Sequence, residues 1–250
     1  MKKQLIGEVV GTFILVFFGC GAVAGSVLFD SFEGLFDIAA IWGIAVALAI
    51  TLARPLSGAH LNPAMTLAFA LMGNFKKRKI PLYFFGQFLG AFLAAAVLYL
   101  LFGSAIESFE LEKGITRGSP GSEQSALIFG EYFDSKTPMR TAFLAEFLGT
   151  ALLAFFVFGI VEKEHRTPLP NWLIPFSIGL ALTILISIFA PLSMAGFNPA
   201  RDLAPRIFSM LAGWETHPFR ANGAGWLAVY VLAPFLGGPI GALLAKKLLK

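Results

Sequence analysis

Apolar residues in this chain form long uninterrupted runs rather than an alternating pattern. A helix needs roughly 20 apolar residues to cross the ~30 Å hydrocarbon core of a bilayer. Six runs approach or exceed this length, near residues 4–28, 38–53, 81–102, 139–161, 172–191 and 226–244. Two further apolar runs, 62–72 and 198–211, are too short to cross. The pattern predicts an all-α membrane protein with six transmembrane helices and two short helices.

Composition supports the same fold class. Hydrophobic residues make up 57% of the 250 residues and charged residues only 14%, too few for the surface of a soluble domain. The chain is therefore expected to lie in a lipid bilayer. Its net charge of +4 is small and dispersed, so no nucleic-acid partner is expected. The start Met1-Lys2-Lys3 resembles a signal peptide, but the apolar run after it is long enough to span and is interpreted as a retained helix.

Lysine and arginine distinguish the two faces of the predicted bundle. Eleven lie on segments of one side: Lys2, Lys3, Lys76, Lys77, Arg78, Lys79, Lys163, Arg166, Lys246, Lys247 and Lys250. Five lie on the other side, where acidic residues including Glu131 gather. Positive charge collects on cytoplasmic loops, so both termini are predicted to be cytoplasmic in a plasma-membrane protein. Residues 103–138 then form a long external connection.

Two related halves are visible in the sequence. Glu8 and Glu146 occupy matching places in the motifs that open the halves, and the segments 57–64 and 193–200 match at an offset of 136. Residues 1–250 are therefore predicted to form a single transmembrane domain of two repeats, about 1–110 and 136–250. Three spans in each half make the repeats inverted, and such architectures place the functional site at the repeat interface near the midplane.

Each short helix is predicted to begin at an Asn-Pro-Ala motif. Asparagine is a favoured N-cap, and proline at the next position loses no hydrogen bond because that N–H has no helical partner. With its oxygen used for capping, each asparagine amide would keep two N–H donors free for a solute. The two positive helix ends would disfavour cations where they meet. The motifs are Asn62, Pro63 and Ala64 in the first half, and Asn198, Pro199 and Ala200 in the second.

These motifs carry a resemblance to a known family. The segment 57–64, together with the run Asn198-Pro-Ala-Arg-Asp202, resembles the major intrinsic protein (aquaporin) family, and the resemblance covers essentially the whole chain. It implies the aquaporin-like fold, a passive channel without a cofactor, and a homotetramer. Asp202, Arg206 and Pro234 resemble the glycerol-conducting (aquaglyceroporin) branch.

A selectivity filter is expected on the external side. Arg201 lies about 4.5 Å along the helix from Asn198, and a mid-membrane charge is too costly to face lipid. The pore wall is its expected place, with a structural salt bridge as the alternative. Trp42 begins the second span at a similar depth and is either a pore residue or an interfacial anchor. By resemblance, a Trp–Arg pair of this kind forms the filter of bacterial glycerol facilitators.

Two positions depart from that facilitator pattern. Ile186 stands where those channels carry glycine, and Ala195 where they carry an aromatic residue. The set Trp42, Ile186, Ala195 and Arg201 looks closer to that of plant nodulin-like intrinsic proteins. Water, urea, ammonia and metalloid acids therefore stay open beside glycerol.

For three polar residues inside the predicted spans and loops, both a functional and a structural interpretation are open. Glu8 and Glu146 are predicted to lie inside the membrane. Because ionisable residues there are costly, a functional role is the first hypothesis for both. By resemblance they are structural acceptors for the irregular backbone before each Asn-Pro-Ala. His60 is expected either to line the pore or to pack as a hydrogen-bonded core residue.

Other classes of function are weighed against the channel. An ion-coupled secondary transporter also uses inverted repeats, but its titratable candidates, Glu8, Glu146 and Asp202, each have a structural reading. An enzyme is not expected, since no nucleophile–base set or metal cluster is evident. The favoured hypothesis is a passive channel for glycerol and other small uncharged solutes, and also water, excluding ions and protons. No metal and no cofactor are expected.

Overall fold

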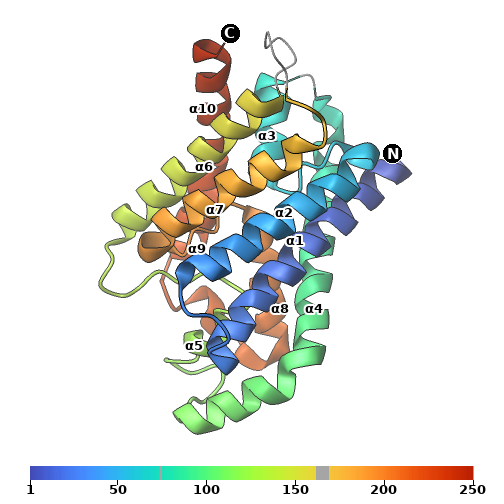
Figure 1. Cartoon of the computed structure of the whole chain (residues 1–250). Helices are drawn as coiled ribbons and strands as arrows, with labels where there is room; N and C mark the ends of the chain where they lie inside the picture. The colour runs from blue at the N-terminus through green and yellow to red at the C-terminus, as the bar shows by residue number, and fades with distance from the viewer. Residues whose placement is uncertain (74, 162–168, 250) are drawn as a thin grey trace.

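The computed structural model describes residues 1–73, 75–161 and 169–249, and over these ranges the chain is helical without strands (Figure 1). Lys163, Arg166 and Lys250, which entered the charge argument, lie outside the described residues. Six apolar segments within these ranges are long enough to cross a membrane. They are α1 (Lys2–Phe29), α2 (Leu35–Ser57), α4 (Ile80–Lys113) with η1 (Lys77–Lys79) before it, α6 (Met139–Val161), α7 (Leu173–Ser193), and the run of α9 (Gly225–Leu227), η4 (Ala228–Leu232) and α10 (Ala233–Leu248). The predicted fold class is confirmed.

Two short helices lie among the spans. They are α3 (Pro63–Met72) and α8 (Pro199–Ser209), the latter followed by η2 (Met210–Trp214). Each packs mainly against a span of the other half, since α3 contacts α10 and α8 contacts α4. At 10 and 11 residues, neither helix is long enough to cross. They are the two re-entrant half-helices.

The helix contacts of the two halves correspond. In the first half α1 packs on α2 and α4, in the second α6 packs on α7 and α10, and α2 meets α7 between them. Small residues permit these close approaches. A Cβ on Gly90 of α4 would collide with the carbonyl of Val9 in α1, and one on Gly237 of α10 would collide with the carbonyl of Phe147 in α6.

Both chain termini lie at the same end of the bundle, and the short helix α5 (Glu123–Ala126) lies at the opposite end (Figure 1). This arrangement follows from an even number of crossings. The connection at the far end is shorter than predicted, because α4 continues past residue 102 to Lys113. Its extra turns bury Ile106 and Glu110, and Gly114 ends the helix with a left-handed φ of 64°. The prediction from long apolar runs ended too early, because a helix that is not surrounded by lipid needs apolar residues only along the face that it buries.

Candidate functional site

Each half-helix is capped by the asparagine of its motif. The Asn62 side-chain oxygen accepts from the Ala64 N–H at 2.8 Å, and that of Asn198 accepts from the N–H groups of Ala200 and Arg201 at 3.0 and 3.3 Å. Both asparagines have extended backbone conformations, as an N-cap requires. The capping geometry is the one that the sequence predicts.

The two caps are also bonded across the repeat interface. Asn62 Nδ2 donates to the Phe197 carbonyl at 2.8 Å, and Asn198 Nδ2 donates to the Leu61 carbonyl at 2.8 Å. One N–H of each amide is therefore occupied, which corrects the expectation of two free donors. The second N–H of each amide makes no hydrogen bond to the residues that the structure describes. The sequence could not show this, because the bond joins segments more than 130 residues apart.

The backbone before each motif is held by an intramembrane carboxylate. Glu8 accepts from the N–H groups of His60 at 3.0 Å and Leu61 at 2.8 Å. Glu146 accepts from the N–H groups of Gly196 at 2.8 Å and Phe197 at 2.7 Å. Both carboxylates are fully buried, and irregular backbone at membrane depth needs such internal acceptors.

These segments also adopt a matched unusual conformation. Ala59, Leu61, Ala195 and Phe197 have positive φ values of 56°, 55°, 58° and 51°. Such values are uncommon outside glycine and are maintained only when the surroundings enforce them. Here the buried carboxylates and the crossed asparagine bonds are the enforcing contacts.

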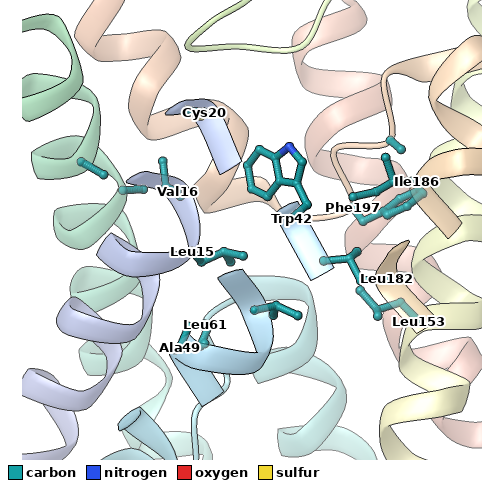
Figure 2. Packing of buried hydrophobic residues seen from close by; sticks show 14 of the residues in the cluster. Leu15, Val16, Cys20, Trp42, Ala49, Leu61, Leu153, Leu182, Ile186 and Phe197 are labelled. Atoms are coloured by element: carbon teal, nitrogen blue, oxygen red, sulfur yellow. The ribbon is translucent and has the colours of Figure 1, made fainter. Parts of the chain in front are cut away.

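A narrow cavity of about 110 Å³ runs along the bundle. Four helices line it with residues spaced four apart, which share one helix face. These are Trp42, Val46, Ile50 and Arg54 of α2; Met65 and Phe69 of α3; Leu153, Val157 and Val161 of α6; and Ile174, Ile178, Leu182 and Ile186 of α7. This lining is apolar except for Arg54, and part of it is visible in Figure 2.

A second group of lining residues contributes polar groups to the cavity. It consists of the irregular segments before each motif together with both caps and two charged residues: Gly58, Ala59, His60, Leu61, Asn62, Met194, Ala195, Gly196, Phe197, Asn198, Glu131 and Arg201. The structure thus brings seven predicted site residues to one cavity: Asn62, Asn198, Trp42, Ile186, Ala195, Arg201 and His60. Glu8, Glu146, Asp202 and the Pro–Ala pairs 63–64 and 199–200 lie behind it.

Arg201 and Trp42 meet at one end of the cavity. The guanidinium carbon lies 4.6 Å from the centre of the indole ring. Arg201 Nη1 donates to the Phe129 carbonyl at 3.3 Å, and Nη2 pairs with Glu131 Oε1 at 2.5 Å. Arg201 therefore both lines the cavity and forms a salt bridge, so the two readings of its role are not exclusive.

Glu131 is a site residue that the sequence interpretation missed, having been counted with the external acidic residues. Its side chain is only 6% exposed. It follows a run of apolar residues, 126–129, and precedes two aromatic residues. That apolar flank was the available signal, because an unpaired carboxylate rarely sits in such a stretch.

Asp202 does not line the cavity and bonds the connection between α4 and α6. Its carboxylate pairs with Arg206 Nη2 at 2.8 Å and Nε at 3.0 Å, and accepts from the Glu131 backbone N–H at 2.7 Å. Arg206 in turn donates to the Glu131 carbonyl and lies over the Tyr132 ring at 4.5 Å. This buried pair therefore positions the residue that bonds Arg201.

His60 has both of its predicted features. It lines the cavity, its Nδ1 lies 3.2 Å from the Thr66 hydroxyl, and its ring stacks on Phe69 with centroids 4.6 Å apart. Over the described ranges, no three His, Cys, Asp or Glu side chains come close enough together to hold a metal ion.

Six spans, two half-helices joined at their caps, and a cavity along the bundle define a membrane channel. The Major intrinsic protein family model matches residues 1–245, and the chain belongs to this family. It is 38% identical to the glycerol uptake facilitator protein of Pseudomonas aeruginosa, over 96% of this chain and 86% of that one. It is 37% identical to human Aquaporin-9, over 98% and 81%. It superimposes on the aquaglyceroporin from Plasmodium falciparum with a TM-score of 0.87 and 26% identity, covering 98% and 96%.

Membership of this family makes the chain an integral membrane transport protein rather than an enzyme. The family resemblance drawn from the sequence motifs is confirmed.

Proposed function

We propose that the chain is a passive channel for glycerol and other small uncharged solutes, and for water, that excludes ions and protons. The observation that carries the proposal is the continuous cavity, which passes both asparagine caps and ends at Trp42 and Arg201. Relatives named for glycerol uptake and an aquaglyceroporin structure support the same solute class.

The cavity walls suit a polyol. The stripes of α2, α6 and α7 are apolar apart from Arg54 and match the carbon edge of glycerol. The two asparagines each offer one N–H that makes no hydrogen bond to the described residues, and Arg201 offers its donors, to the hydroxyl edge. The helix ends at Asn62 and Asn198 carry partial positive charge, which disfavours cations at the centre.

The membrane setting is part of the proposal. We assign both termini to the cytoplasm of a plasma-membrane protein, and α5 with its neighbouring loops to the external face. Basic residues at the end of α10 and in η1, such as Lys246 and Lys77, support this orientation. The repeats of about 1–110 and 136–250 and a homotetramer remain proposals, supported by the matching helix contacts and the family.

Stopped-flow light scattering of proteoliposomes tests the function. Purified protein should raise the permeability to glycerol and water above that of empty liposomes, with less effect for urea and larger polyols. Protein carrying Gly237→Leu is a matched control, because that side chain would collide with the Phe147 carbonyl and disrupt the packing of α10 on α6. Glycerol permeability equal to that of empty liposomes would contradict the proposal.

The same vesicles distinguish a channel from an ion-coupled transporter. Passive flux should rise in proportion to the glycerol gradient and should be unaffected by exchanging sodium for choline or by collapsing a proton gradient. Saturation together with dependence on either ion would favour the transporter instead.

A further inference from the structure

The connection between α4 and α6 contributes one charged side chain, that of Glu131, to the lining of the cavity. A second cavity of about 220 Å³ lies beyond the first. Four residues line both cavities and therefore mark the boundary between them: Trp42, Glu131, Ile186 and Met194. Three of these are apolar, so the Glu131 carboxylate is the polar group at that boundary.

Glu131 also fills a gap in the wall. Ala195 and Gly196 present almost no side chain to the cavity, yet both line it. The Glu131 Cγ lies 3.4 Å from the position that a Cβ on Gly196 would take. A residue from the connection between α4 and α6 thus contacts the space that a side chain at position 196 would occupy.

The carboxylate is held rigidly at this place. The backbone N–H of Glu131 donates to Asp202, its carbonyl accepts from Arg206, and its Oε1 pairs with Arg201 at 2.5 Å. Three separate contacts therefore fix backbone and side chain. A carboxylate offers about four lone-pair directions, so the pair with one guanidinium leaves acceptor capacity on a side chain that lines both cavities.

We propose that Glu131 is a specificity-determining residue of the external constriction, where its carboxylate accepts hydrogen bonds from the solute while Arg201 donates to it. The inference rests on the proposed channel function. The constriction then presents an acceptor and a donor side by side and carries no net charge. It favours small neutral solutes with several hydroxyl groups, each able to donate and accept, over water, which makes fewer of these contacts at once.

Glu131→Gln tests the proposal in proteoliposomes. Glutamine keeps the size and one acceptor oxygen, which can still bond Arg201, but it replaces the charged acceptor with an amide donor. Hydrogen bonds to charged acceptors are roughly twice as strong as neutral ones. The ratio of glycerol to water permeability should therefore fall by about tenfold while water permeability stays within about twofold.

Two further variants sharpen the test. Glu131→Asp retains the charge but withdraws it by one methylene, so it should keep glycerol flux and admit a larger polyol such as xylitol. Glu123→Gln is the matched control, because that carboxylate lies on the same connection, bonds Gly121 and His217, and lines neither cavity. It should leave the solute ranking unchanged.

The outcomes separate this inference from the proposed function. Wild-type vesicles that pass no glycerol would overturn the function itself. Wild-type vesicles that pass glycerol, with an unchanged glycerol-to-water ratio in Glu131→Gln, would overturn the inference alone and leave Glu131 as a support for Arg201. An equal loss of glycerol and water permeability in Glu131→Gln would also overturn the inference alone. If Glu131→Gln does not assemble, Glu131→Asp decides, and an unaltered polyol cut-off refutes the inference.

Discussion

Removing the guanidinium of Arg201 should expose a latent negative charge in the channel. The ion pair with Glu131 is almost fully buried, with side chains 3% and 6% exposed. Deleting one partner of such a pair leaves an uncompensated buried charge, at a cost of about 3–5 kcal/mol. In Arg201→Val the carboxylate must either bear that cost or bind a proton.

Proton binding gives the prediction its pH dependence. Burial raises the pKa of the Glu131 carboxyl, and the Arg201 guanidinium opposes that rise. Without Arg201 the pKa rises further, and since about 1.4 kcal/mol corresponds to a factor of ten, proton affinity should increase by about two to four powers of ten. At low pH the constriction is then neutral, and as the pH rises through the new pKa it becomes negative. Cation leak in Arg201→Val should therefore increase with pH.

Planar-bilayer conductance in potassium chloride at several pH values measures this leak. The double variant Arg201→Val with Glu131→Gln is the critical comparison, because it removes both charges and should conduct cations less than Arg201→Val at high pH. It should also melt at a higher temperature in detergent than the single variant. An Arg201→Val leak that is independent of pH and identical in the double variant would refute the argument that Glu131 controls the charge of the constriction.

Three further predictions concern the filter, the caps and the backbone supports. Trp42→Ala should admit larger polyols and Ala195→Phe should restrict flux toward water, measured as the solute ranking in vesicle swelling; an unchanged ranking in both would place the filter elsewhere. Asn62→Asp and Asn198→Asp should each sharply reduce glycerol flux in folded protein, because both the free donor and the bond to the opposing carbonyl are lost, the latter at about 1–3 kcal/mol. Undiminished flux in both would exclude a central role for the amides. Glu146→Gln should lower the unfolding temperature, since its two oxygens each accept from a backbone N–H and glutamine replaces one of them with an amide donor; an unchanged unfolding temperature would contradict this supporting role.

The architecture could be predicted from the sequence because it depends on constraints that act within short segments of the chain. Bilayer thickness sets the length of a span, so six long apolar runs and two short ones were recognisable without knowledge of any contact. Capping chemistry is equally local, and Asn62 and Asn198 cap the two half-helices as their motifs predict. The family resemblance rested on the same motifs and is confirmed by the match over residues 1–245. The roles of individual site residues remain predictions.

Only the tertiary structure decided what those residues contact. The crossed bonds from Asn62 and Asn198 to the opposite halves occupy donors that a local reading left free. The burial of Glu131 against Arg201 depends on a connection that folds back over the bundle, fastened by Asp202 and Arg206. Burial and pairing between residues 70 or more positions apart are set by the packing of the whole chain. A sequence pattern can therefore show that Arg201 must avoid lipid, but not which carboxylate neutralises it.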